Sequence, residues 1–336
     1  KSAYEVECRA KEGKHINTIK EDLEALVDKR LHWTLLTLPI LGIVIFTILP
    51  LVFMICMAFT SYSKVGDHLT IFHWVGLKNF STVLGMGNSI GKTFWSVLGW
   101  TLIWAVLATF LNYILGMILA IVINRKTTRI KGFWRFCFML SAAIPQFVSL
   151  LLMRTMLKDN GLINNLLVQA GLISSPLPFL TNATWARATV VIINLWVGIP
   201  FTMMQVTGIL QNIPGELYEA ARVDGAGPVT IFFKITLPYM LFVTTPYLIT
   251  TFTGNINNFN VIYLLTSSTA TANMAFANSN AKETDLLITW LFTLTNDNSN
   301  YKMASVIGII SFVICALLTL LSYSRMISGD KEEVYQ

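Results

Sequence analysis

Six long runs of apolar residues, separated by shorter polar segments, dominate the sequence. They fall at residues 35–59, 94–123, 133–157, 188–210, 238–265 and 303–323. Each run is long enough to cross the hydrocarbon core of a bilayer as a helix, which takes about 20 residues. The pattern therefore predicts an all-α integral membrane protein with about six transmembrane helices.

Composition and charge agree with a membrane protein. Hydrophobic residues make up 54% of the chain and charged residues only 12%, which is too apolar for an ordinary soluble domain. Basic residues are concentrated before the first run and after the second, so both termini should face the cytoplasm. The net charge of +6 follows from this bias. Because no basic stripe with interleaved aromatic residues is present, the sequence does not predict nucleic-acid binding.

Three parts can be separated along the chain. Residues 1–34 should form a cytoplasmic segment with an amphipathic helix at 18–30, because apolar residues recur on one helical face there and would lie on membrane lipid. This segment is expected to be neither a cleaved signal nor a domain of its own. Residues 35–326 should form the transmembrane domain, and residues 327–336 a cytoplasmic tail.

A polar loop at 212–237 separates the fourth and fifth runs and has the features of two short helices. Pro214 suits a first helical turn, Glu216 and Glu219 complement the helix dipole, and Gly225 can end the helix in a left-handed conformation. Pro228 can open the second helix. The first helix would expose a small apolar surface, suited to a groove in another protein, formed by Leu217, Tyr218, Ala220 and Ala221. An ordinary helix at the membrane interface is the alternative.

The spacing within this loop resembles the coupling loop of ABC importer permeases. Glu-Ala-Ala at 219–221 is followed by three residues, Gly225, nine residues, Ile235, one residue and Leu237-Pro238. In that family the loop holds a coupling helix that docks in a cleft of the cytoplasmic ATPase. The resemblance implies ATPase-coupling roles for Glu216, Tyr218, Glu219, Ala220, Ala221, Asp224 and Gly225.

Uncharged polar residues crowd two of the apolar runs, whereas ionisable residues are almost absent from all of them. The fourth run carries Asn194 and Gln205, and the fifth contains Thr250, Thr251, Thr253, Asn255, Asn257, Asn258 and Asn260. The lack of ionisable groups argues against a proton-coupled transporter. Amides facing lipid would be costly, so we expect these side chains to line a cavity or to join helices. Amides and hydroxyls beside aromatic rings suit a sugar, and chemistry alone favours neither interpretation.

The same two runs resemble the helices that contact sugar in maltose and maltodextrin permeases. The resemblance is carried by NLWVGIPF at 194–201 and TFTGNINNF at 251–259, with TDLL at 284–287 in support. It nominates as substrate-binding Asn194, Val197, Gly198, Phe201, Thr251, Gly254, Asn255 and Asn258. Gly254 stands where that pattern can offer an aromatic residue, and Phe201 lacks a tyrosine hydroxyl. A longer or different oligosaccharide therefore stays open.

The connections expected outside the cell carry further elements. Residues 158–184 should contain a short helix near 162–169, and residues 284–295 a half-apolar helix that is either a lid or partner surface or a helix lying on the membrane. The stretch at 85–93 looks like a phosphate-binding loop, but Met86 stands where the first glycine is required. The cysteines and histidines are dispersed, without metal spacing.

The sequence thus predicts a permease subunit of an ATP-driven importer for an oligosaccharide, of the maltodextrin type, in the plasma membrane of a bacterium. We expect no catalytic or metal site and no cofactor on this chain, with ATP and Mg bound by a separate ATPase dimer. The resemblance further implies a second permease in a heterodimer and an extracellular sugar-binding protein. The alternatives are a permease for another neutral sugar or a glycerol-phosphate ester, or a membrane scaffold or receptor.

Overall fold

The computed structural model describes residues 11, 31–65, 68–69, 72–125, 127–266, 276 and 279–333, and the chain divides into two units, Lys1–Met57 and Ala58–Gln336. Apart from Lys11, the described part of the first unit consists of three consecutive helical segments: α3 (Leu31–Ile43), the π-helical turn η1 (Val44–Ile48) and α4 (Leu49–Ala58). The last of them extends one residue past the boundary of the unit. Together they contain a candidate membrane span at Leu35–Ala58. The amphipathic helix predicted at 18–30 lies outside the described residues.

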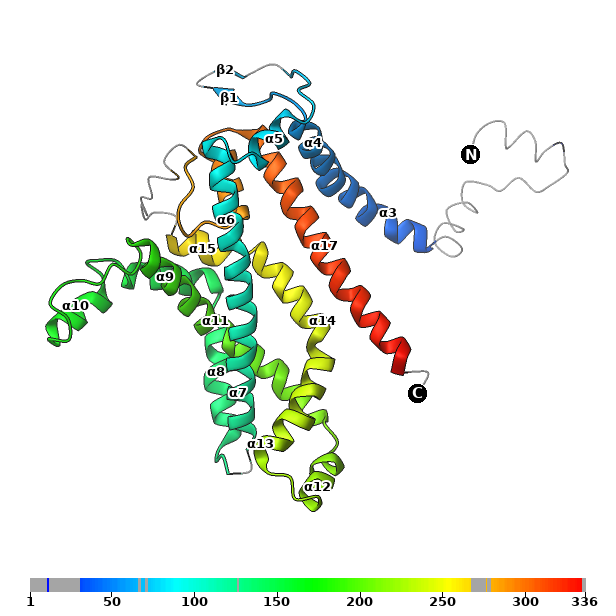
Figure 1. Ribbon diagram of the computed structural model, residues 1–336, viewed down its shortest axis with the longest axis vertical. Coiled ribbons are helices and arrows are strands. Elements are labelled where there is room, and N and C mark those ends of the chain that lie inside the picture. Colours follow the sequence, from blue (N-terminus) through cyan, green and yellow to red (C-terminus); the bar gives the residue numbers. More distant parts are fainter. Residues whose placement is uncertain are drawn as a thin grey trace. The chain divides into compact units, whose positions relative to one another are not determined.

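The second unit is almost entirely helical (Figure 1). A short antiparallel hairpin near its beginning consists of β1 (Lys64–Val65) and β2 (His68–Leu69). The helical segments are α5 (Lys78–Leu84), α6 (Ser89–Val106), η2 (Leu107–Leu111), α7 (Asn112–Asn124), α8 (Lys131–Ala143), α9 (Gln146–Met156), α10 (Leu162–Gln169), α11 (Ala183–Asn212), α12 (Gly215–Val223), α13 (Pro228–Ile231), η3 (Phe232–Thr236), α14 (Leu237–Ile256), α15 (Phe259–Thr266), α16 (Leu287–Asn296) and α17 (Tyr301–Glu333). Helix α17 thus continues into the predicted tail.

Within the described ranges, five helical segments are long and apolar enough to cross a membrane, and a bent pair can count as a sixth. The span predicted at 133–157 corresponds to a broken pair of helices, α8 and α9, which meet at 84°. Pro145 disfavours the helical conformation of the residue before it, and Ile144 is indeed extended, with φ −76° and ψ 130°. The fifth span is interrupted as well, at Asn257 and Asn258 between α14 and α15.

Close helix packing holds the middle of this unit together. Gly116 of α7 lies against Thr202 of α11, and a Cβ at position 116 would come within 2.8 Å of the threonine side chain. A glycine at this point lets the two backbones approach closely. Trp104 of α6 is fully buried and its indole N–H donates to the carbonyl of Asn255 in α14, at 3.2 Å. These contacts fix α6, α7, α11 and α14 around the cavity described below.

The half-apolar helix predicted at 284–295 is α16, and it packs into the protein. Its Trp290 is fully buried and donates to the carbonyl of Ser279 at 2.9 Å. Asp285, just before the helix, accepts hydrogen bonds from the Lys282 backbone N–H and the Thr289 hydroxyl, at 2.7 and 2.9 Å, and burial raises the pKa of this carboxyl. α16 therefore differs from a helix that merely lies on the membrane. The short helix predicted near 162–169 is confirmed as α10.

Candidate functional site

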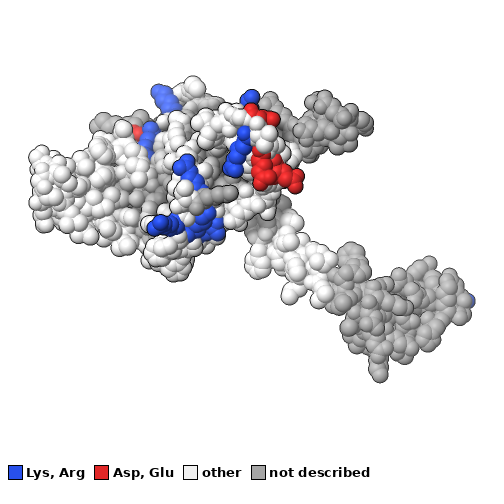
Figure 2. Space-filling model, turned by 90° about the horizontal axis from the view of Figure 1, so that it is seen from below, with Lys and Arg blue, Asp and Glu red and all other residues white. Residues whose placement is uncertain are grey.

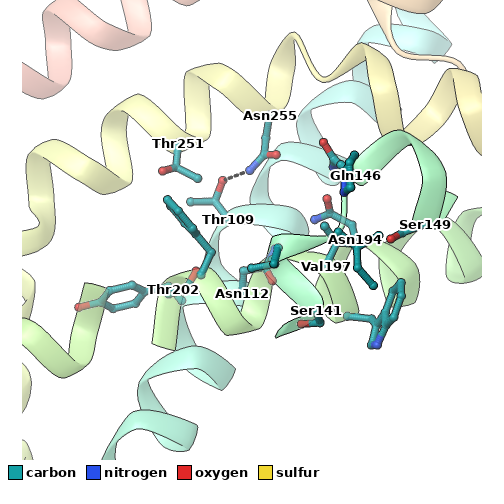
Figure 3. Close-up of a pocket in the computed structure, with 18 of the residues that line it drawn as sticks. Thr109, Asn112, Ser141, Gln146, Ser149, Asn194, Val197, Thr202, Thr251 and Asn255 are labelled. Carbon is teal, nitrogen blue, oxygen red and sulfur yellow. Dashed lines mark hydrogen bonds between the residues drawn. The ribbon is translucent and has the colours of Figure 1, made fainter. Parts of the chain in front are cut away.

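A cavity of about 440 Å³ lies among four elements of the second unit: the η2–α7 junction, the break between α8 and α9, α11, and α14. Figure 3 shows amide and hydroxyl side chains converging on it from these elements. None of the described residues that line the cavity carries a charge. The lining combines aromatic rings with neutral hydrogen-bonding groups, which suits an uncharged polar ligand.

Six of the eight residues that the sequence nominated line this cavity. They come from α11 and α14 and are Asn194, Val197, Gly198, Phe201, Thr251 and Asn255. Gly254 and Asn258 are not among the lining residues. A Cβ at Gly254 would meet only open space. The Asn258 amide instead donates to Asn255 Oδ1 and accepts from the Val261 backbone N–H, both at 3.3 Å, so it supports the break between α14 and α15.

Asn255 both lines the cavity and joins two helices, which are the two roles that the sequence left open. It lines the cavity, and its amide also donates to the Thr109 hydroxyl of η2 at 3.0 Å (Figure 3). That hydrogen bond joins α14 to η2 in the middle of the unit. Replacing Asn255 would therefore change helix packing together with the cavity surface.

Sequence reasoning missed the contribution of η2 and the start of α7. In η2 the backbone hydrogen bonds join residues five apart instead of four. Such π-helical turns within α-helices are often found at functional sites. Thr109 lies in this turn and Asn112 directly after it, and both line the cavity. Asn112 is 8% exposed and donates to the Ala108 carbonyl at 2.7 Å, whereas its Oδ1 is buried and accepts no hydrogen bond from any described residue. A buried acceptor without a partner, in a residue that lines a cavity, is unusual in a folded protein.

Gly198 of α11 faces this asparagine. A Cβ at position 198 would stand 2.7 Å from Asn112 Oδ1 and 2.9 Å from Asn112 Cγ, closer than such atoms approach each other. The glycine therefore leaves the space in which the Asn112 amide lies. Both residues line the cavity.

The break between α8 and α9 supplies further residues that the sequence did not nominate, among them Ser141, Gln146 and Ser149. The last carbonyl groups of α8 have no donor within the helix because the helix stops at Ala143. Irregular backbone at membrane depth is tolerated where it borders a cavity. Pro200 has a related effect in α11, because it has no N–H to donate to the Trp196 carbonyl four residues earlier. Pro145 within an apolar run was the sequence signal for this region.

The coupling segment predicted at 212–237 lies at one end of α7, α11 and α14 (Figure 1). Helix α12 ends at Val223, and Gly225, just beyond its C-cap Asp224, has φ +77°. The N–H groups of Gly225 and Ala226 donate to the carbonyls of Arg222 and Ala221, at 3.0 and 2.9 Å. This is the Schellman arrangement that a left-handed glycine permits. The predicted glycine stop is confirmed.

The surface of α12 is largely open. Glu216, Glu219, Ala220 and Asp224 are exposed. Figure 2, which looks onto this end, shows most of the visible acidic side chains in one group and the basic side chains in others. Tyr218 departs from the expected outward face. It is half-buried, and its hydroxyl lies 3.2 Å from the Thr236 hydroxyl of η3.

Leu217 keeps its predicted exposed position beside the acidic group, and Val223 adds a second exposed apolar side chain. Leu217 is 44% exposed and Val223 is 87% exposed, whereas Ala221 is half-buried. Among the residues that the structure describes, no group of three or more His, Cys, Asp or Glu side chains could hold a metal ion.

Comparisons with known proteins agree with this arrangement. The family described as "Binding-protein-dependent transport system inner membrane component" matches residues 112–327. The galactooligosaccharides transport system permease protein GanP of Bacillus subtilis (strain 168) is 33% identical, covering 99% of this chain and 78% of GanP. The maltodextrin transport system permease protein MdxF of the same strain is 34% identical, covering 96% of this chain and 75% of MdxF.

A solved structure supports the fold. The chain superposes on a bacterial ABC transporter involved in the import of the acidic polysaccharide alginate with a TM-score of 0.73 at 22% identity, covering 91% of this chain and 98% of that one. The family match spans both the cavity helices α11 and α14 and the coupling segment. The chain belongs to the binding-protein-dependent transport system inner membrane components and is a multi-pass membrane permease of an ABC importer, with a transport role rather than a catalytic one.

Proposed function

We propose that this permease moves a neutral oligosaccharide, of the maltodextrin or galactooligosaccharide class, through the cavity between α7, α11 and α14. The observation that carries the proposal is the set of uncharged polar groups around the buried acceptor Asn112 Oδ1. A buried polar atom without a partner is costly, and a sugar hydroxyl can donate to it. The two permease relatives, named for galactooligosaccharides and maltodextrin, support this class of substrate.

The shape and chemistry of the cavity fit a sugar in two further respects. Its volume of about 440 Å³ falls within the range of ligand pockets, about 300–1,000 Å³. Trp196, Phe201 and Tyr247 present aromatic surface beside the amides and hydroxyls. Sugar rings need both kinds of surface, because their C–H faces pack on aromatic rings while their hydroxyls need paired hydrogen bonds.

The mechanism we propose is alternating access driven by a partner. An ATPase dimer, which binds ATP and Mg, would hold α12, and its closure would move α14 through α13 and η3. The hydrogen bond between Tyr218 and Thr236 ties α12 to η3 and so supports this route. The ATPase must bind one conformation of the permease more tightly than the other. A partner that binds two conformations equally well does not shift the equilibrium between them.

The remaining partners complete the proposal. A second permease would close the other side of the pathway, and an extracellular sugar-binding protein would deliver the substrate, in line with the family's description. The coupling segment and both termini would then face the cytoplasm, with the apolar outer faces of the helices in the lipid of the plasma membrane. Residues such as Phe242, Phe312 and Leu320 are more than 60% exposed in this chain, as lipid-facing positions should be.

Substrate charge gives the sharpest test of this proposal. The transporter, reconstituted with its ATPase, second permease and binding protein, should take up labelled maltose, maltotetraose or a galactooligosaccharide, and should reject an alginate oligosaccharide. The reason is that no described Lys or Arg lines the cavity to pair with a carboxylate. ATP-dependent uptake into proteoliposomes measures this. Uptake of the acidic sugar alone, or of none of these sugars, would contradict the proposal.

A further inference from the structure

Gln205 is an amide in a membrane helix, and it does not line the cavity of about 440 Å³ described above, here called the main cavity. It belongs to α11 and is half-buried, and its Oε1 is buried without a hydrogen-bond partner among the described residues. It lines a second cavity of about 290 Å³, which α11 and α14 form between them. The other lining residues are Val206, Ile209, Val243, Thr244 and Tyr247.

The two cavities share one wall. Tyr247 is the residue that lines both of them. On α11, Gln205 lies four residues beyond Phe201 of the main cavity, which is about one helical turn or roughly 6 Å along the axis. On α14, Tyr247 likewise lies one turn before Thr251. Because α11 runs into the coupling segment and α14 leads out of it, the second cavity is nearer that segment on both helices.

The chemistry of the second cavity matches that of the first on a smaller scale. Gln205 offers a buried acceptor, as Asn112 does in the main cavity. The Thr244 hydroxyl is already engaged with Tyr113 and the Met240 carbonyl, at 2.7 and 2.6 Å. The rest of the lining is aliphatic or aromatic, and none of these residues is charged. The Gln205 amide and the Tyr247 hydroxyl, set beside aliphatic and aromatic surface, favour a ligand that carries hydroxyl groups on a body with apolar faces.

We infer that this second cavity is a saccharide subsite on the path from the main cavity towards the coupling segment, with Tyr247 between the two subsites. This inference rests on the proposed function. A sugar hydroxyl donates to Gln205 Oε1 while the ring packs on Tyr247. A disaccharide fits the main cavity alone, whereas a longer chain reaches past Tyr247 and uses both subsites.

The test compares chain lengths within one variant. Gln205→Leu keeps a side chain of similar size and removes the acceptor, and Gln211→Leu, at an exposed position near the end of the same helix, is the matched control. Uptake is measured in the complete reconstituted transporter with maltose and maltotetraose, and with a galactose disaccharide and tetrasaccharide. We expect Gln205→Leu to lower the ratio of tetrasaccharide to disaccharide uptake about fivefold, the size of one lost hydrogen bond, and Gln211→Leu to leave the ratio unchanged.

The ratio is independent of how much variant protein folds, because both sugars are measured on the same preparation. An unchanged ratio in Gln205→Leu, while the unmodified transporter takes up both lengths, overturns the subsite and leaves the proposed function standing. If the second permease is lost from the purified Gln205→Leu complex and the ratio is unchanged, the amide contacts the other subunit. That result also overturns the subsite. If the unmodified transporter takes up none of these sugars, the proposed function fails and the subsite with it.

Discussion

Replacing Gly225 by proline should lower ATP-dependent uptake by about two orders of magnitude while the chain still inserts into the membrane. Proline is fixed near φ −65°, whereas Gly225 has φ +77°. The substitution also removes the N–H that donates to the Arg222 carbonyl at 3.0 Å. Strain of this kind costs on the order of 1–3 kcal/mol, enough to unwind the end of a helix of 9 residues and to remove the surface on which coupling depends.

Gly227 provides the matched control for this experiment. It has φ −72° and a Cβ there would meet nothing within 4 Å, so Gly227→Ala should keep near-normal uptake. Membrane fractionation and size-exclusion chromatography report insertion and folding, and uptake into proteoliposomes reports coupling. Normal uptake by Gly225→Pro would remove the coupling role from α12. Equal loss in both variants would show only that the loop tolerates no change.

Gly198→Val should also lower uptake strongly, by roughly 10- to 100-fold, because overpacking of this kind costs about 1–3 kcal/mol. The first added atom already falls 2.7 Å from Asn112 Oδ1, so the Asn112 amide must leave its place in the cavity. The two γ-methyl groups then fill space that the substrate needs. ATPase docking through α12 should be unaffected, since position 198 is far along α11 from the coupling segment.

The matched control lies on the same helix. Gly208 is exposed and has open space around the position of a Cβ, so Gly208→Val should retain most of the uptake. Comparing the two variants separates cavity loss from the general effect of valine in α11. Wild-type substrate dependence in Gly198→Val would show that this cavity lies off the transport path. Co-purification of the ATPase with both variants checks that docking is intact.

The sequence predicted the helices and the glycine turn of the segment at 212–237 well because their geometry is local. A left-handed glycine after a short helix and a proline opening the next helix depend on neighbouring residues alone. Asn194 and Asn255 were found for a similar reason, since an amide in an apolar run has few places to go in a membrane. In each of these cases the residue type was unusual for its surroundings: a glycine or proline at the end of a helix, or an amide in an apolar run. That departure from the local pattern marked the site.

The remaining parts of the site depend on features that hydropathy does not record. The π-helical turn η2 has no sequence mark, so Thr109 was not nominated. Asn112, an amide within the apolar run at 94–123, carried the same signal as Asn194 and was overlooked. Residues 133–157 gave a continuous apolar signal although Pro145 bends the pair by 84°. Gly254 was nominated from a pattern that can place an aromatic residue there, and without a side chain it does not reach the cavity.

The most direct test of the account is to identify the proteins that purify with this chain in mild detergent after ATP and vanadate trapping. The account predicts recovery of an ABC ATPase, a second permease and a sugar-binding protein, and loss of the ATPase when Gly225→Pro is used instead. Mass spectrometry of the purified complex gives both results. Recovery of the chain without an ATPase, or equal recovery of the ATPase with Gly225→Pro, would contradict the claim that α12 couples ATP hydrolysis to the cavity.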